Sequence, residues 1–125
     1  MWPKNKQQED FKKISKEISN QISSTAAKHD RDGTFPHNHF SLMKRLGYIK
    51  ASVPEQFGGN GHGLTDLALA QFEIGKGNGA TAISVGMHHM VVGTEVESEK
   101  WPTRLRRRIF EKIAEENTCL LYTSD

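Results

Sequence analysis

The sequence is poor in the features that mark secreted or membrane-spanning proteins. It holds one cysteine, Cys119, so no disulfide can form within the chain, and nothing in it requires an oxidising compartment. The first residues show no apolar signal-peptide core. The longest stretch without Asp, Glu, Lys or Arg, residues 77–94, is shorter than the roughly 20 mostly apolar residues of a bilayer span. We therefore expect a soluble, cytoplasmic protein with no membrane partner.

An excess of charge of one sign is also missing. The 17 lysines and arginines nearly balance the 15 aspartates and glutamates, leaving a net charge of +2. The arginines at positions 104 and 106–108 share their segment with glutamates at 111, 115 and 116. A solvent-exposed or interface-pairing helix face explains this pattern more simply than a nucleic-acid site, so we expect no nucleic-acid partner.

Helical periodicity is the main signal that the sequence does contain. Apolar residues recur at steps of three and four in five segments, near residues 9–28, 35–47, 66–76, 80–94 and from 101 onward. The pattern predicts an all-α fold of about five helices. Gly47 fits a left-handed cap at the end of the second helix, and Thr65 fits an N-cap for the third. Residues 48–53, before Pro54, look extended.

The predicted helices differ in how much of their surface is apolar. In the third, Leu67, Ala70 and Ile74 share one face, which Leu69 and Phe72 widen. The fifth carries Leu105, Ile109 and Ile113 at steps of four. The fourth is apolar nearly all round, which is typical of a helix buried on every side. A chain of 125 residues offers little surface to cover it, so we expect this helix to pack against further structure.

No catalytic or metal-binding constellation emerges from the residues alone. The glycine-rich residues 58–63 lack the phosphate-loop patterns, so a tight turn packing a helix pair is the better interpretation. His37 and His39 point about 200° apart on a helix, and His88 and His89 about 100° apart. Zinc needs three or four converging ligands, so we expect no metal site. In a mostly apolar helix, His88 or His89 could line a ligand cavity, although a satisfied core histidine is the favoured interpretation.

An ordered series of motifs resembles a known family. Residues 29–36 (HDRDGTFP), 46–48 (LGY), 53–61 (VPEQFGGNG) and 72–77 (FEIGKG) follow one another with the spacing found in the N-terminal helical domain of the acyl-CoA dehydrogenases. The resemblance covers residues 29–114. It implies an all-α N-terminal domain over residues 1–118 that belongs to a longer, three-part enzyme.

The resemblance implies a FAD-dependent oxidoreductase of fatty acid metabolism. Such a flavoprotein removes two hydrogens across the α,β carbons of an acyl-CoA thioester. It is usually reoxidised by an electron-transferring flavoprotein, and we expect a homo-oligomer when the protein is complete. The family's glutamate base and most of its flavin contacts lie beyond this domain. We therefore expect no catalytic and no cofactor-binding residue here, and no turnover by this fragment alone.

The family's N-terminal domain helps to wall the acyl and flavin pocket, which makes the fourth helix the candidate substrate-binding element. Ile83, Gly86, Met87 and Met90 share one of its faces, and methionines suit an adaptable apolar lining. Ordinary core packing explains the same spacing equally well. Two other functions stay open: the N-terminal domain of a flavin-dependent monooxygenase of the same superfamily, or a stand-alone helical interaction module.

The end of the chain departs from the family. Residues 119–125 (CLLYTSD) resemble an in-frame translation of a transposase-recognition end used in sequencing libraries. The family would show a Thr-Glu-Pro-type flavin segment near this point. We therefore expect a non-native tail over residues 119–125, in which Cys119 has no function.

Overall fold

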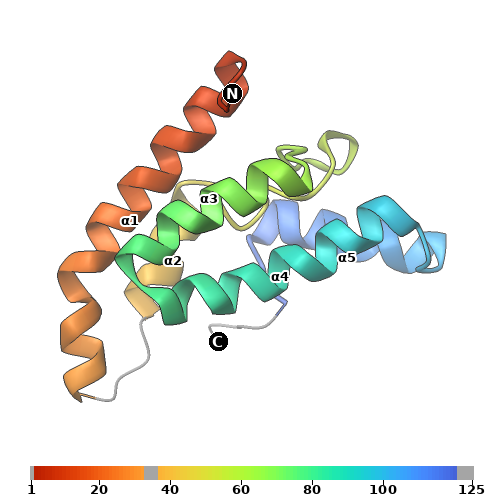
Figure 1. Ribbon diagram of the computed structural model, residues 1–125. Helices are drawn as coiled ribbons and strands as arrows, with labels where there is room; N and C mark the ends of the chain where they lie inside the picture. The colour runs from red at the N-terminus through yellow and green to blue at the C-terminus, as the bar shows by residue number, and fades with distance from the viewer. Residues whose placement is uncertain (1, 33–36, 121–125) are drawn as a thin grey trace.

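The computed structural model describes residues 2–32 and 37–120, and within these the fold is all-α (Figure 1). It confirms five α-helices and adds a short 3-10 helix, η1, without a β-strand among the described residues. In chain order the elements are α1 (Lys6–Asp32), α2 (His37–Arg45), η1 (Glu55–Phe57), α3 (Leu64–Gly77), α4 (Gly79–Ser98) and α5 (Thr103–Glu116). The predicted opening of the second helix at Phe35-Pro36 lies outside the described residues.

The glycine cap predicted for α2 is confirmed. Gly47 has φ +80°, the left-handed conformation that glycine adopts without a Cβ clash. Its N–H donates to the Lys44 carbonyl at 3.1 Å, and the Tyr48 N–H donates to the Met43 carbonyl at 2.9 Å. This pair of bonds is the Schellman motif. It ends α2 and turns Tyr48 into the core, where its side chain is fully buried.

Two local predictions are wrong. Residues 48–53 form turns, in which Ala51 N–H donates to Tyr48 O and Val53 N–H to Lys50 O, both at 3.2 Å. The glycine-rich segment runs back along these turns, since His62 N–H donates to Ala51 O at 2.9 Å. Backbone groups that an extended strand would leave unpaired are thereby satisfied. Thr65 is not a cap either: α3 begins one residue earlier, at Leu64, with Gly63 at the N-cap.

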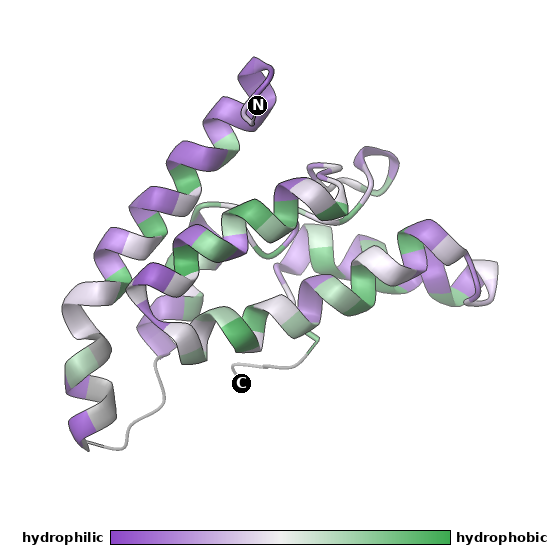
Figure 2. Cartoon of the chain, in the orientation of Figure 1, coloured by the Kyte–Doolittle hydropathy of each residue, from purple (hydrophilic) through white to green (hydrophobic). Residues whose placement is uncertain are grey.

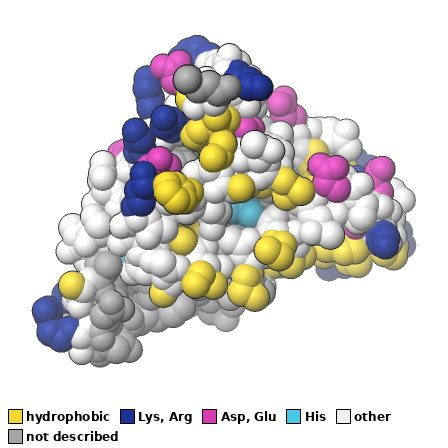
Figure 3. Space-filling model, in the orientation of Figure 1, with side chains coloured by type: hydrophobic (Ala, Val, Ile, Leu, Met, Phe, Trp, Pro, Cys, Tyr) yellow, Lys and Arg dark blue, Asp and Glu magenta, His cyan; other side chains and the backbone are white. Residues whose placement is uncertain are grey.

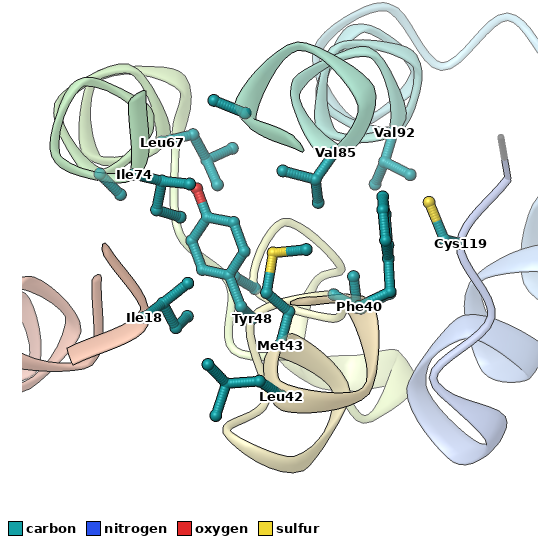
Figure 4. Close-up of a cluster of buried hydrophobic side chains, with 14 of the residues drawn as sticks. Ile18, Phe40, Leu42, Met43, Tyr48, Leu67, Ile74, Val85, Val92 and Cys119 are labelled. Carbon is teal, nitrogen blue, oxygen red and sulfur yellow. The ribbon is translucent and has the colours of Figure 1, made fainter. Parts of the chain in front are cut away.

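The core lies where α1, α2, the 48–53 turns, α3 and α4 meet (Figure 4). Each of these parts contributes a fully buried side chain: Ile18 from α1, Met43 from α2, Tyr48 from the turns and Ile74 from α3. The hydrophilic colour dominates α1, whereas α3 and α4 carry longer hydrophobic stretches (Figure 2). The apolar stripe of α1 therefore covers one side of α3, and the other faces of α1 meet solvent.

Not every predicted core position is buried. Leu67, Ala70 and Ile74 of α3 are buried as predicted, but Leu69 and Phe72 are exposed. They are 37% and 67% exposed because α3 is covered by α1 and α4 on two sides only, and its third side faces outward. In α5, Ile113 is buried and Leu105 is exposed, because Phe110 takes the central position against Phe57 of η1. Their ring centroids lie 5.5 Å apart.

Each tryptophan joins two parts of the fold. The Trp2 indole N–H donates to the Asp66 carboxylate at 2.9 Å, which ties the segment before α1 to the first turn of α3. Trp101, in the connection between α4 and α5, lies 5.8 Å from Phe110, centroid to centroid. The two indoles therefore report on two different junctions of the fold, α1 with α3 and α4 with α5.

Candidate functional site: an apolar groove between α3 and α4

A groove of about 430 Å³ separates α3 from α4. The yellow side chains that border this hollow in Figure 3 come from the two helices. The residues that line it are Leu64, Leu67, Ala68, Gln71, Ala82, Ile83, Gly86, Met87, His89 and Met90. All four residues predicted to bind substrate, Ile83, Gly86, Met87 and Met90, are among them.

The α4 wall of the groove follows from helical spacing. Ile83, Met87 and Met90 lie three and four residues apart, so their side chains stand one above another along the helix. All three are exposed, Ile83 and Met90 at 67% each. The described chain therefore leaves one apolar face of α4 uncovered, which agrees with the expectation that this helix packs against further structure. One side of α4 is buried, and the other presents a continuous apolar wall.

Gly86 keeps the middle of the groove open. Opposite it, the Gln71 amide donates to the Ala82 carbonyl and accepts from the Tyr48 hydroxyl, both at 2.6 Å. A Cβ at position 86 would lie 2.6 Å from the Gln71 Nε2 atom. Gln71 is fixed at both ends of its amide and has little freedom to move away. Glycine at 86 thus allows a polar bridge between α3 and α4 without closing the groove.

His89 is the one ionisable side chain among the groove-lining residues. It is 2% exposed, and its Nδ1 atom lies 2.7 Å from the Ser52 hydroxyl. Its ring meets Tyr48 edge-on at 4.9 Å between centroids. Within the described part of the chain, its Nε2 atom has no hydrogen-bond partner. Burial, then the neighbouring His88, hold the pKa of His89 well below its usual value, so the ring is neutral.

His88, by contrast, is a satisfied core histidine, which confirms the favoured interpretation for this residue. Its Nε2 atom lies 2.8 Å from the Ile49 carbonyl, so it carries the proton and donates. Its Nδ1 atom accepts from the Leu120 N–H at 3.0 Å. Burial also lowers the pKa of His88. His39 is buried in the same way, between the hydroxyls of Thr25 and Thr81 at 2.7 and 2.8 Å.

In the arginine-rich segment of α5, Arg106 has a structural role. Arg106 lies over the rings of Phe57 and Phe110, and its Nε atom lies 2.9 Å from the buried Glu95 carboxylate. Arg104, Arg107 and Arg108 are exposed. Among residues 2–32 and 37–120, no cluster of three His, Cys, Asp or Glu residues could hold a metal ion, and no helix is long and apolar enough to cross a membrane.

The comparisons with known proteins fit this geometry. The family model described as acyl-CoA dehydrogenase, N-terminal domain, matches residues 5–116. The chain belongs to the acyl-CoA dehydrogenase family. Among its relatives in this family is the acyl-CoA dehydrogenase-type protein YdbM of Bacillus subtilis (strain 168), 31% identical over 101 residues, covering 81% of this chain and 26% of YdbM.

Two further proteins are also similar to this chain. SfnC of Pseudomonas putida, whose name gives an FMNH2-dependent monooxygenase, is 26% identical over 81 residues, covering 65% of this chain and 20% of SfnC. The crystal structure of KijD3 in complex with dTDP matches with a TM-score of 0.77 at 28% identity, over 94% of this chain and 31% of KijD3. The acyl-CoA dehydrogenase domain described here thus spans about a quarter of YdbM and less than a third of KijD3.

Proposed function

We propose that this chain is the N-terminal domain of a flavin-dependent oxidoreductase that dehydrogenates acyl-CoA thioesters. In this proposal the groove between α3 and α4 takes the apolar part of the acyl group. The observation that supports it is that Ile83, Gly86, Met87 and Met90 all line one groove, together with the membership of the family. Apolar, adaptable side chains around one opening suit alkyl chains of variable shape.

The chemistry of the groove limits what this domain does in such an enzyme. Its lining residues include no lysine, arginine, aspartate or glutamate, so they offer a phosphate group no charged partner. We therefore place the flavin phosphates and the CoA phosphates outside this groove. A bound flavin would supply the hydride acceptor. The residues described here would position the acyl chain and keep water away from it, which strengthens any electrostatic interaction at the reacting carbons.

A substitution that fills the groove, made in the complete enzyme that carries this domain, tests the proposal. Met87→Trp adds volume inside the groove, so we expect kcat/KM to fall most for the longest acyl-CoA substrates and least for the shortest. Val91→Trp is the matched control, because Val91 is exposed on the same helix but does not line the groove. An unchanged ratio of kcat/KM across acyl lengths in Met87→Trp would remove the lining role.

A flavin-dependent monooxygenase is the second candidate, favoured by the similarity to SfnC. The two chemistries differ in how electrons move. A dehydrogenase reduces an electron acceptor, such as an electron-transferring flavoprotein, when acyl-CoA is added. A monooxygenase consumes oxygen only when reduced flavin is supplied. Measuring both rates on the same complete enzyme separates the candidates.

We also propose that the 125-residue chain by itself does not turn over substrate, because its described residues contain no group of side chains arranged for catalysis. Flavin absorbance that co-purifies with this chain would contradict the proposal. Of the proposed tail, Cys119 is buried and Leu120 contacts His88, while residues 121–125 lie outside the described residues.

A further inference from the structure

The outward face of α5 is charged along its length, with the two signs in separate halves of the helix. Three arginines lie in the first half and three glutamates in the second: Arg104, Arg107, Arg108, Glu111, Glu115 and Glu116. Together with Thr103 and Lys112 they line one surface hollow, to which no other described element contributes. The opposite side of α5 carries the buried Phe110 and Ile113, so the charged face is the side that a partner can reach.

This distribution of charge is unfavourable for α5 by itself. The helix dipole favours acidic side chains at the N-terminus and basic ones at the C-terminus. The first turn of α5 has no acidic residue and its last turn no basic residue. Arg104, Arg108 and Lys112 also follow one another at steps of four, where like charges repel. Within the described chain, the one ion pair of this face joins Arg107 to Glu111 at 3.4 Å, so most of its charges have no opposite partner.

Four of these charges form a stripe that is complementary to itself. Arg104, Arg108, Glu111 and Glu115 are separated by four, three and four residues, the spacing of a seam between two packed helices. Beside a second copy of the stripe that runs in the opposite direction, Arg104 faces the Glu115 position of the copy, and Arg108 faces its Glu111 position. In a parallel pair, arginine would face arginine and glutamate would face glutamate.

We propose that the outward face of α5 is a homodimer interface, in which two copies of this chain pack their α5 helices antiparallel. Two-fold symmetry makes each of the two Arg–Glu pairs occur twice. The acidic half of each helix then lies beside the basic half and the N-terminus of the other, which compensates for the reversed charges of both. Exposed ion pairs are individually weak, so this dimer is weak and sensitive to salt. The inference goes beyond the proposed function and does not depend on the groove.

Sedimentation equilibrium of the 125-residue chain tests the dimer directly. At about 10 mM NaCl, where charges are screened over about 30 Å, we expect a monomer–dimer equilibrium. At about 1 M NaCl, where this length is about 3 Å, the dissociation constant should rise at least about tenfold. Association through the exposed apolar side chains of α3 and α4 would not be weakened in this way.

Charge reversals then locate the interface. Arg104→Glu with Arg108→Glu makes the stripe wholly acidic, and Glu111→Arg with Glu115→Arg makes it wholly basic. Each double variant alone should dimerise at least about tenfold more weakly at low salt, because like charges then face each other. An equimolar mixture of the two should associate again. The variant that carries all four substitutions restores the antiparallel match, so it should dimerise like the unchanged chain.

Lys16→Glu with Lys28→Glu is the matched control. It changes the net charge as much as the double arginine variant does, on exposed positions of α1, and should leave the dimer intact. A chain that stays monomeric at low salt would overturn the proposal. A dimer that survives both high salt and the double variants would assign the association to another surface and overturn it too. Failure of the four-substitution variant to associate would exclude the antiparallel pairing.

Discussion

At the scale of single residues, the close approach of Gly59 to Val53 is the tightest requirement in the glycine-rich segment. A Cβ at position 59 would overlap both the carbonyl oxygen and the Cβ of Val53. Val53 is fully buried, and its carbonyl accepts from the Gly61 N–H at 2.9 Å. Neither side of the contact can move away without breaking the turns that hold Ser52 beside His89.

We expect Gly59→Ala to lower the free energy of unfolding by about 1–3 kcal/mol, the usual cost of forcing extra volume into a packed site. Gly63→Ala is the control, since nothing lies within 4 Å of a Cβ at that position and its φ of −82° suits any residue. Its effect should be within about 1 kcal/mol. Urea unfolding followed by circular dichroism measures both variants, and equal losses would contradict the steric argument.

The two buried histidines of α4 make stability depend on pH. Burial lowers the pKa of both His88 and His89 in the folded chain. In the unfolded chain the same two histidines bind protons near the ordinary histidine pKa of about 6.5. The free energy of unfolding is therefore highest above about pH 6.5, and it decreases as the pH falls below this value. We expect up to about 1.4 kcal/mol of loss per pH unit for each histidine in this window.

Urea unfolding at pH 7.5 and at pH 5.5 tests this dependence. His88→Gln keeps a donor and an acceptor near Ile49 and Leu120 but cannot bind the proton. Its stability should therefore fall less between the two pH values than that of the unchanged chain. The same fall in both proteins would show that His88 does not contribute.

At the scale of elements, α3 and α4 are joined by a single residue that serves both. Asn78 ends α3, where its N–H donates to the Ile74 carbonyl at 3.1 Å. Its side chain also caps α4 by accepting from the Thr81 N–H at 3.2 Å. Asn78 therefore ends one wall of the groove and begins the other.

Removing the cap should loosen the helix pair. We expect Asn78→Ala to cost about 1 kcal/mol of unfolding free energy, the typical value for an N-cap. Asn20→Ala is the control for loss of an amide, because Asn20 is exposed in the interior of α1. There alanine's higher helix propensity should leave stability equal or slightly raised. A loss as large in Asn20→Ala would contradict a specific role for the cap.

Glu95 connects α4 to α5 through three contacts. Its Oε1 atom accepts from the N–H groups of Lys100 and Trp101, both at 2.9 Å, and its Oε2 atom lies 2.9 Å from Arg106 Nε. The carboxylate is 1% exposed, so its loss leaves a mostly buried guanidinium and two N–H groups unpaired. A buried charge of this kind is tolerated only while it is paired.

We expect Glu95→Ala to destabilise the chain by about 3–5 kcal/mol, the cost of breaking a buried ion pair from one side. Glu9→Ala removes an exposed partner of Lys13 at 3.9 Å and should cost at most about 1 kcal/mol. Thermal unfolding of the two variants compares them. Similar melting temperatures would show that the α4–α5 connection does not depend on Glu95.

The sequence predicted the elements that depend on local patterns and missed those that depend on distant partners. Periodicity indicated all five helices, and Gly47 indicated its own cap because φ above zero is a local property. Thr65 failed as a cap because α3 already begins at Leu64, with Gly63 at the N-cap. The face of α4 that lines the groove followed from spacing. The contacts of His89, which also lines the groove, did not follow from spacing. Ser52 and Tyr48 contact its ring from a turn about 40 residues earlier in the chain.

At the scale of the whole molecule, large apolar side chains of α3 and α4 gather on one face. Phe72, Ile83, Met87 and Met90 are each more than half exposed. The opposite side of both helices is well packed, so this exposure does not reflect a poor core. Contiguous apolar surface of this kind marks a binding groove or an interface.

We expect Met87→Glu combined with Met90→Glu to reduce the binding of the dye ANS without lowering the free energy of unfolding, because both side chains are exposed in the folded chain. Arg108→Glu, on the exposed side of α5, is the control and should leave ANS fluorescence unchanged. A loss of unfolding free energy of more than about 1 kcal/mol in the double variant would show that these methionines belong to the core.

The placement of Trp2 against Asp66 and of Trp101 against Phe110 has a practical consequence. Because these are the two tryptophans of the chain, fluorescence of Trp2→Phe follows the α4–α5 junction alone, and that of Trp101→Phe follows the α1–α3 junction alone. Coincident denaturation curves from the two would mean that both junctions melt as one cooperative unit. Separate curves would divide the domain into two foldons, with the groove at their boundary.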